Sequence, residues 1–192
     1  MTRKPLIVGL GGTLRDFSST EKALRVVLDA AEADGCETVL LAGRALDLPP
    51  YSPEEPERSE AARRLVDEIR RADGVILGSP GYHGGMSGLV KNAIDYIEDL
   101  RTDARPYLDG RAVGVVATGG GWQGAVTTMN SLRDVVHALR GWNTPLGVAV
   151  NTAEPVFGPD GDCEDARIRG QLEALGRQVA GFARAAVGDA AA

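Results

Sequence analysis

Glycine, hydroxyl and arginine residues gather close to the N-terminus, in the stretch GTLRDFS at positions 12–18. An apolar run at 5–10 precedes this stretch, and an amphipathic helix pattern at 24–31 follows it. Small hydroxyl side chains, backbone N–H groups and a helix N-terminus together favour a bound anion. Arg15 would add a charge-assisted hydrogen bond. The stretch therefore indicates a phosphate cradle, with a Ser18 N-cap beside a surface arginine as the alternative interpretation.

Two further glycine-rich stretches, at 78–88 and 118–124, could bring the backbone close to a planar ligand. Each follows an apolar run that is typical of a buried strand. Glycine lets the backbone approach a ligand closely, and Pro80 stiffens the exit from its strand. Tyr82 and His83 add flat, partly polar surface. We therefore expect both stretches to follow strand ends and to face a ligand.

Two common nucleotide-binding motifs do not fit the sequence. A G-x-G-x-x-G motif that begins at Gly9 would need glycine at position 14, where Leu14 stands. The acidic residue expected after the second strand is missing, since 42–44 reads Ala-Gly-Arg. The chain has no Gly-Lys-Ser/Thr, which a P-loop requires. A dinucleotide-binding dehydrogenase is therefore disfavoured.

The histidines and cysteines form no pattern for hydrolysis or metal binding. His83 and His137 lack the partners of a Ser-His-Asp triad, and we expect His137 to be a structural residue near the core. Cys36 and Cys163 are far apart and lack metal-ligand spacing, so we expect reduced thiols. The sequence predicts neither a metal site nor a hydrolase.

Strand and helix signals alternate along the chain, which is typical of an α/β protein with a parallel sheet. Five strands in one domain fit the doubly wound order 2-1-3-4-5, in which strands one, three and four are adjacent. The three stretches described above would then meet at one edge of the sheet. The expected strands lie at 5–10, 37–42, 75–79, 111–118 and 146–150.

The stretch at 78–96 resembles the flavin-binding loop of NAD(P)H-dependent FMN reductases of the flavodoxin-like superfamily. In that family a strand ends in S/T-P-x-Y, as at 79–82 here, and a helix begins with G-x-L/V-K-N-A-I/L-D, as at 88–95. The first stretch resembles the family motif G-S-x-R-x-x-S, with Thr13 in place of the serine. The hydroxyl group is kept, so the substitution is mild.

The resemblance implies a single flavodoxin-like FMN-binding domain over residues 1–192, with a doubly wound sheet of five parallel strands in the order 2-1-3-4-5. We expect the alanine-rich tail to fray from about Ala185. The implied cofactors are FMN and NADPH or NADH. No side chain is expected to act as a catalytic acid or base, because hydride transfer needs stacking and orientation instead.

By the same resemblance, the FMN phosphate would be held by Thr13, Arg15, Ser18 and Thr20; the family often has asparagine where Thr20 stands. The sequence leaves two interpretations open for each of two aromatic residues. Tyr82 either contacts the flavin or packs in the core. Trp122 either covers the edge of the flavin ring or packs inside the protein. The flavin ring and ribityl chain would contact Pro80, Gly81, Tyr82, His83, Thr118, Gly119, Gly120 and Gly121.

The implied activity is that of an NAD(P)H:FMN oxidoreductase, which would transfer hydride from a nicotinamide to FMN. The leading hypothesis is a flavin reductase that supplies reduced flavin to an acceptor or a partner monooxygenase. The alternatives are an FMN-dependent quinone or azo reductase and a non-enzymatic flavodoxin-like electron carrier. Flavodoxins usually carry a T/S-x-T-G-x-T phosphate loop, which is absent here.

Composition bounds the partners. The chain has 192 residues, of which 25% are charged, and a net charge of −6, which argues against a nucleic-acid partner. We expect a cytoplasmic protein without membrane contact, because no signal-peptide pattern and no apolar run of about 18 residues occurs. The family resemblance implies a homodimer or homotetramer, with helices at 89–100 and 129–139 at the interface. The proline-rich stretch 49–56 is an exposed loop or helps to wall a neighbouring subunit's site.

Overall fold

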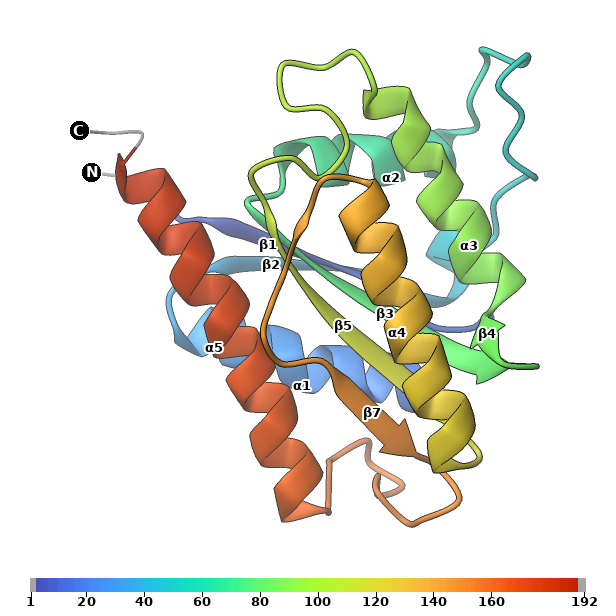
Figure 1. Cartoon of the computed structure of the whole chain (residues 1–192), viewed down its shortest axis with the longest axis vertical. Coiled ribbons are helices and arrows are strands. Elements are labelled where there is room, and N and C mark those ends of the chain that lie inside the picture. Colours follow the sequence, from blue (N-terminus) through green and yellow to red (C-terminus); the bar gives the residue numbers. More distant parts are fainter. Residues whose placement is uncertain (1–2, 190–192) are drawn as a thin grey trace.

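The computed structural model describes residues 3–189 and shows helices packed on both faces of a twisted sheet (Figure 1). Strands and helices alternate along the chain, as the sequence predicts. The elements are β1 Leu6–Gly11, α1 Ser19–Ala33, β2 Glu37–Leu41, α2 Glu60–Arg71, β3 Gly74–Tyr82, β4 Gly85–Met86, α3 Gly88–Asp95, β5 Ala112–Gly119, α4 Trp122–Ala138, β6 Trp142–Asn143, β7 Val148–Asn151 and α5 Ala166–Asp189.

The sheet has the order β2-β1-β3-β5, and both β6 and β7 pair with β5. These strand pairs are all parallel. The predicted order 2-1-3-4-5 is therefore confirmed, with β6 and β7 sharing the fifth place. The expected strand at 146–150 is wrong in its bounds: β7 begins at Val148, because the N–H of Leu146 donates to the side-chain oxygen of Gln178 at 3.2 Å and not to the sheet.

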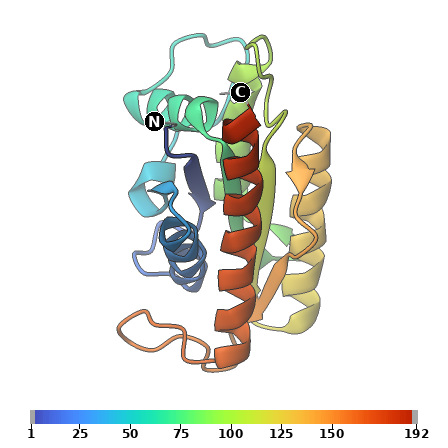
Figure 2. The same cartoon turned by 90° about the vertical axis from the view of Figure 1, so that its left-hand side faces the viewer.

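Each of the three central strands is buried on both faces, and its residues alternate between two hydrophobic clusters. In β1, Leu6 and Val8 face the cluster that contains residues of α2, α3 and α4. Ile7 faces the cluster that contains residues of α1 and α5, two helices that pack against each other over the other face (Figure 2). Burial on both faces explains why the strands read as continuous apolar runs.

Local capping residues set the starts of the helices. The Ser18 hydroxyl accepts a hydrogen bond from the N–H of Glu21 at 3.3 Å, so Ser18 is the N-cap of α1. Asp165 does the same for α5, since one carboxylate oxygen accepts from the N–H groups of Arg167 and Ile168. The 3₁₀ helix Tyr96–Leu100 continues α3, so the expected helix at 89–100 changes type after Asp95.

Helix α5 includes residues 185–189, where the sequence predicts that the chain begins to fray. The buried residues Val179, Ala180 and Ala183 anchor this part of α5. The alanines that follow have the highest intrinsic helix propensity, so the helix continues past the last buried turn. Residues 190–192 lie outside the described part of the chain.

Two charged groups close the amino ends of the strands. Asp73, 4% exposed, accepts hydrogen bonds from the Arg3 guanidinium at 2.6 and 2.8 Å and from the N–H of Leu6 at 2.9 Å. Arg111, 1% exposed, donates to four carbonyl oxygens, at Arg70, Ala72, Tyr107 and Asp109. Both groups therefore have their hydrogen-bonding capacity taken up by the fold.

The proline-rich stretch after β2 packs against α3 of its own chain. Asn92 accepts a hydrogen bond from the N–H of Tyr51 at 2.8 Å and donates one to the carbonyl of Pro49 at 2.9 Å. Arg58 pairs with Asp99 at 2.8 Å. Asn92 therefore has a structural role, and its contacts fix the loop beside α3.

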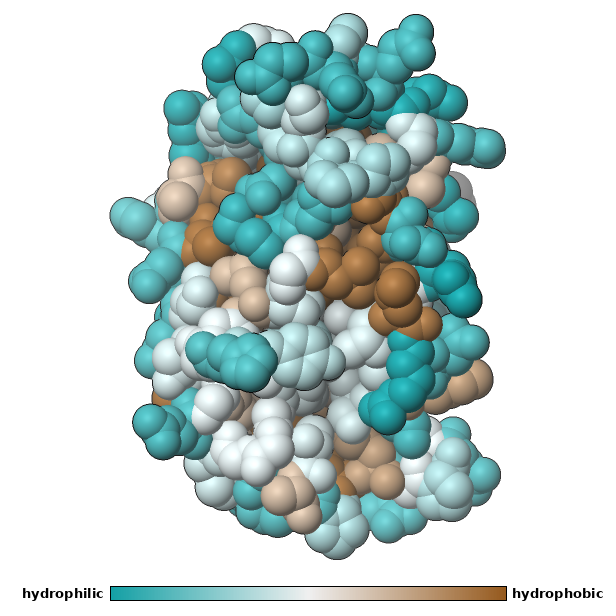
Figure 3. Space-filling view, turned by 90° about the vertical axis from the view of Figure 1, so that its right-hand side faces the viewer, coloured by the Kyte–Doolittle hydropathy of each residue, from teal (hydrophilic) through white to brown (hydrophobic). Residues whose placement is uncertain are grey.

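The face that carries α3 and α4 shows hydrophobic side chains gathered between charged ones (Figure 3). A shallow groove of about 320 Å³ lies between the two helices on this face. Both apolar and charged side chains line it. Its lining residues are Tyr51, Lys91, Ile94, Asp95, Glu98, Val135, Ala138 and Leu139.

Candidate functional site

The loops after β1, β3, β5 and β7 meet at the carboxyl edge of the sheet and enclose a hollow of about 150 Å³. Ten of the twelve predicted contact residues line it, whereas His83 and Gly121 do not. Ser19 and Thr152 line it as well and were not predicted. The full lining is Thr13, Arg15, Ser18, Ser19, Thr20, Pro80, Gly81, Tyr82, Thr118, Gly119, Gly120 and Thr152.

Hydroxyl groups dominate the end of the hollow at α1. The buried hydroxyls of Thr20 and Thr118 lie 2.7 Å apart in a mutual hydrogen bond, which ties the first turn of α1 to the end of β5. The Thr13 hydroxyl accepts the N–H of Arg15 at 3.1 Å. The first N–H groups of a helix have no partner within the helix. Together these groups form a surface suited to an oxyanion.

Arg15 is the cation of this region. Its side chain is exposed and has no carboxylate within 4.0 Å among residues 3–189. The nearby acidic residue, Glu21, is paired instead with Arg25 at 2.6 Å and accepts the N–H of Phe17 at 3.1 Å. The guanidinium of Arg15 therefore stays available for an anionic ligand.

The central stretch is a hairpin, and β3 continues three residues beyond the end at 79 that the sequence predicts. β3 continues to Tyr82 because Pro80 still pairs with Thr118 of β5, and β4 then pairs with β3 in the antiparallel direction. The two turn residues, His83 and Gly84, have φ values of 51° and 86°, as two-residue hairpins of type I′ require.

This hairpin explains where its side chains lie. The Ser79 hydroxyl accepts the N–H of Ser87 at 3.0 Å and so holds the return of the chain toward α3. His83 lies at the exposed tip and does not reach the hollow. Tyr82 is exposed, which excludes the core-packing alternative.

The third strand exit leaves its backbone open. A Cβ atom at Gly119 would lie 3.1 Å from the backbone nitrogen of Ala125, so a larger residue would crowd α4. At Gly120 and Gly121 a Cβ atom would meet no atom within 4 Å. Trp122 is 42% exposed and is not a packed core residue. The glycines therefore form an open shelf beside the hollow.

Two residues differ from expectation for reasons of position. His137 is exposed on α4, so the prediction of a residue near the core is wrong; buried Val136 takes the inward direction at that turn. Thr152 was missed although it follows the fifth strand. Its N–H donates to the carbonyl of Gly119 at 2.7 Å, which brings it to the shelf.

The residues present suit the phosphate end of FMN: six Ser and Thr side chains, a helix N-terminus and the Arg15 guanidinium, which has no carboxylate partner among residues 3–189, line one hollow. The hollow is smaller than the roughly 300–1,000 Å³ of common cofactor pockets. It is therefore too small for the whole cofactor. The flavin ring would have to lie across the open shelf at Gly120 and Gly121.

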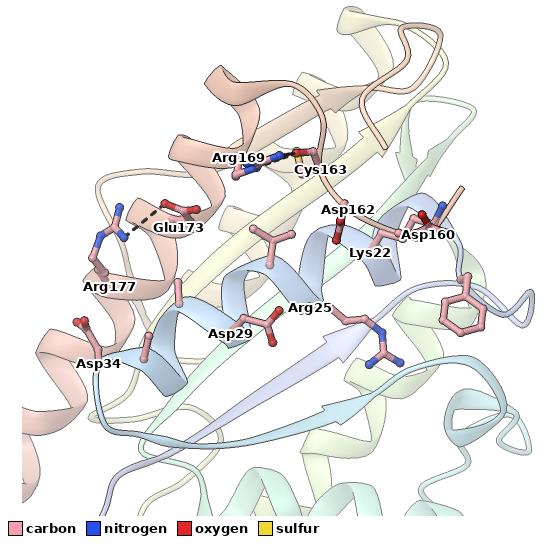
Figure 4. A pocket seen from close by; sticks show the side chains of 15 residues that line it. Lys22, Arg25, Asp29, Asp34, Asp160, Asp162, Cys163, Arg169, Glu173 and Arg177 are labelled. Atoms are coloured by element: carbon pink, nitrogen blue, oxygen red, sulfur yellow. Dashed lines mark hydrogen bonds and ion pairs between the residues drawn. The ribbon is translucent and has the colours of Figure 1, made fainter. Parts of the chain in front are cut away.

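The larger groove on the outer surface between α1 and α5, about 580 Å³, is less suited to a flavin (Figure 4). Its charged side chains bond mainly to the protein itself. Arg169 donates to the Cys163 carbonyl, Arg177 pairs with Glu173, and Lys22 donates to the carbonyl of Gly158 at 2.9 Å. It lacks the open glycine backbone of the sheet edge.

The two cysteines are free and buried. Burial raises the pKa of both thiols, Cys36 and Cys163, so neither is activated at neutral pH. Between residues 3 and 189, no group of three or more His, Cys, Asp or Glu side chains is arranged to hold a metal ion. No helix in the same part of the chain combines the length and apolar character needed to span a membrane.

Comparison with known proteins agrees with this geometry. Residues 5–155 match the family model described as NADPH-dependent FMN reductase. An NADPH azoreductase of Bacillus sp. (strain OY1-2) is 32% identical over 127 residues, covering 66% of this chain and 65% of the relative. An FMN-dependent NADPH-azoreductase of Staphylococcus aureus is 29% identical over 116 residues, covering 60% of this chain and 58% of the relative. Each alignment thus spans less than two thirds of the relative.

Solved structures share the fold over nearly the whole chain. FerB of Paracoccus denitrificans, a flavoenzyme NAD(P)H:(acceptor) oxidoreductase, has a TM-score of 0.71 at 25% identity and covers 91% of this chain and 97% of its own. An NADH:FMN oxidoreductase in its apo form has a TM-score of 0.71 at 22% identity, and the match covers 95% of this chain and 90% of that protein.

The fold and the residues at its carboxyl edge define a flavodoxin-like flavoprotein. Within that class, the chain belongs to the NADPH-dependent FMN reductase family. That family is one of NADPH-dependent reductases of FMN.

Proposed function

We propose that this enzyme is an FMN-dependent reductase that uses NADPH to reduce small acceptors with an azo or quinone group. The observation that carries the proposal is the joining of two features at one sheet edge: a hydroxyl-lined hollow at α1 and an open glycine shelf beside it. A shelf without a cover leaves room for two flat molecules to approach each other. The names of the Bacillus and Staphylococcus relatives support azo compounds as acceptors.

The residues divide the binding task by their chemistry. Thr13, Arg15, Ser18 and Thr20 would hold the phosphate through hydroxyl groups, backbone N–H groups and one positive charge. Thr118 supports this end through its hydrogen bond with Thr20.

The flavin ring would lie against the backbone of the other loops. Bound FMN would supply the redox chemistry, the relay of two electrons from NADPH to the acceptor; the hydride would provide one proton and water the other. Backbone N–H groups on the shelf would donate hydrogen bonds to the ring, and the hairpin would contact its other parts. The residues assigned to the ring are Pro80, Gly81, Tyr82, His83, Thr118, Gly119, Gly120 and Gly121.

A second candidate is a flavin reductase that releases reduced FMN to an acceptor or to a partner monooxygenase. The small volume of the hollow, about 150 Å³, favours this candidate because much of the flavin would stay exposed and could leave. The non-enzymatic electron carrier is not favoured, since the family is one of NADPH-dependent reductases.

Anaerobic mixing with NADPH tests the proposal. We expect stoichiometric FMN-loaded protein to bleach at 450 nm and to recover its colour when a quinone or azo dye is added, without free FMN. Recovery that requires free FMN in excess of protein would favour the flavin reductase. Protein that binds FMN but stays oxidised under NADPH would overturn both. A matched sample with NADH gives the nicotinamide preference.

We also propose a homodimer or homotetramer that uses the face of α3 and α4. The support is the apolar part of the groove lining there, at Ile94, Val135 and Leu139, together with charged side chains (Figure 3). Residues 1–192 would act as one flavin-binding domain, because both hydrophobic clusters lie on one sheet. The two free cysteines support a cytoplasmic location. Light scattering of the purified chain tests the assembly.

A further inference from the structure

An arginine lies over an exposed tryptophan next to the glycine shelf. The Cζ atom of Arg167, in the first turn of α5, is 5.8 Å from the ring centroid of Trp122, the first residue of α4. This distance is typical of a cation–π contact. The contact joins the starts of the helices that follow β5 and β7, two neighbouring strands.

Arg167 keeps its charge free of carboxylate partners. In the described residues 3–189, its guanidinium has no carboxylate within 4.0 Å, and neither it nor the indole of Trp122 donates a hydrogen bond to another residue. The structure explains why. Asp165, the carboxylate two positions earlier, is engaged as the N-cap of α5 and accepts the backbone N–H groups of Arg167 at 2.8 Å and Ile168 at 3.0 Å.

The pair borders the proposed flavin site on one side. Trp122 follows the open backbone of Gly120 and Gly121, and Gly120 lines the hollow. Thr152, which also lines the hollow, begins the segment that leads to α5. In the strand order β1-β3-β5-β7, this corner lies two strands away from the loop after β1 that carries Arg15. Neither Trp122 nor Arg167 lines the hollow that holds the proposed phosphate site.

We propose that Trp122 and Arg167 form a subsite for aromatic acceptors that carry a sulfonate or carboxylate group. The indole offers a face for stacking, and the guanidinium offers a planar pair of N–H donors for two oxygen atoms of the anion. The cation–π contact limits the freedom of the arginine before the acceptor arrives. This inference rests on the proposed function, since it selects among the acceptors of the same site.

The nicotinamide nucleotide offers the same chemistry, an aromatic group joined to phosphates. We assign the subsite to the acceptor. The kinetic test therefore measures KM for the acceptor and for NADPH. A suitable acceptor pair is 1,4-naphthoquinone and 1,4-naphthoquinone-2-sulfonate, which differ by the sulfonate group.

The test compares the FMN-loaded wild type with Arg167→Gln under steady-state turnover. We expect KM for the sulfonated quinone to rise about tenfold, the effect of losing one charge-assisted contact. KM for the neutral quinone, KM for NADPH and kcat should stay within about twofold. The control is Arg177→Gln on the same helix, where the arginine is paired with Glu173. An equal rise for both quinones, or a rise for NADPH alone, would overturn the subsite.

A binding measurement separates this inference from the proposed function. In a Trp142→Phe background, Trp122 is the only indole, and its fluorescence can be titrated with the sulfonated quinone in the absence of NADPH. We expect saturable quenching that weakens about tenfold when Arg167→Gln is added. Quenching that does not depend on Arg167 would overturn the subsite, whether or not the protein turns over any acceptor. If quenching depends on Arg167 but no acceptor is reduced, the subsite stands and the proposed function fails.

Discussion

The two ends of the sheet use their polar groups in opposite ways. At the amino end, Asp73 and Arg111 are buried and bonded to the fold itself, the former by three hydrogen bonds and the latter by four. At the carboxyl end, the side chains of Arg15 and Arg167 are exposed, without carboxylate partners in residues 3–189. Changes at the amino end should therefore alter stability, and changes at the carboxyl end should alter ligand binding.

The largest effect is expected at Arg111. Arg111→Met should lower the free energy of unfolding by about 3 kcal/mol, because it leaves buried carbonyl oxygens without donors. Burial, with a smaller contribution from the charge of Arg105, lowers the pKa of Arg111 to about 10, so the lost group is a cation at neutral pH. Urea unfolding measures the effect, with exposed Arg64→Met on α2 as the control. A loss below about 1 kcal/mol would show that water replaces the guanidinium.

Arg15→Gln tests the opposite end. We expect the Kd for FMN to rise about 10- to 100-fold, as for a lost hydrogen bond to a charged group. The Kd for riboflavin, which has no phosphate, should change less than twofold, about the scatter of such a titration. The unfolding free energy without flavin should not change. Fluorescence titration of both flavins provides the measurement, and Arg64→Gln is the matched control. A similar rise in the Kd for riboflavin would show that Arg15 does not act on the phosphate group.

Asp73→Asn adds a pH dependence at the amino end. Burial alone would raise the pKa of Asp73, but the hydrogen bonds from Arg3 and Leu6 and the charges of Arg3 and Arg105 outweigh it and lower the pKa below 3.8. The unfolded chain therefore takes up the proton first as the pH falls. The stabilisation is fully present above the unfolded value and is lost as the pH falls through the folded pKa.

We expect Asp73→Asn to lower the free energy of unfolding by about 2 kcal/mol at pH 7. The difference in unfolding free energy between the variant and the wild type should become smaller below about pH 4. Urea unfolding at pH 7, 5, 4 and 3 follows this difference, with the exposed Asp67→Asn as the control. A difference that is constant with pH would mean that the carboxylate charge contributes nothing.

A pair of neighbouring glycines gives the smallest and most local comparison. Gly120→Val places a side chain in open space, so the unfolding free energy should change by less than about 0.5 kcal/mol, as for surface substitutions. The Kd for FMN should still rise about tenfold, because the side chain would crowd the ring. Gly119→Val should destabilise the fold, since its Cβ would lie 3.1 Å from the backbone nitrogen of Ala125. An unchanged Kd for FMN in Gly120→Val would show that the flavin ring does not lie against the shelf.

The strand order and the meeting of the loops could be predicted because they depend on patterns of several residues. Apolar runs separated by helical periodicity predict a parallel sheet, and the order 2-1-3-4-5 brings the loops together. The helical phase of α4 also indicates which of its residues are exposed. Val136 points inward, and its neighbour His137 lies about 100° around the helix, where exposure is expected.

Other features depend on contacts that no local pattern reveals. Pro80 stays in β3 because Thr118 on the adjacent strand pairs with it. The fifth strand begins at Val148 because Leu146 donates its N–H to Gln178 on α5. Thr152 joins the hollow through the carbonyl of Gly119, a residue more than thirty positions away. Strand pairing and the details of the site therefore required the three-dimensional structure.

A crystal structure of the FMN complex tests the central claim most directly. The account predicts the phosphate within hydrogen-bond distance of Ser18, Thr20 and Arg15, and the flavin ring against the backbone at 119–121. FMN bound in the charged groove between α1 and α5, or with its phosphate away from the start of α1, would contradict it.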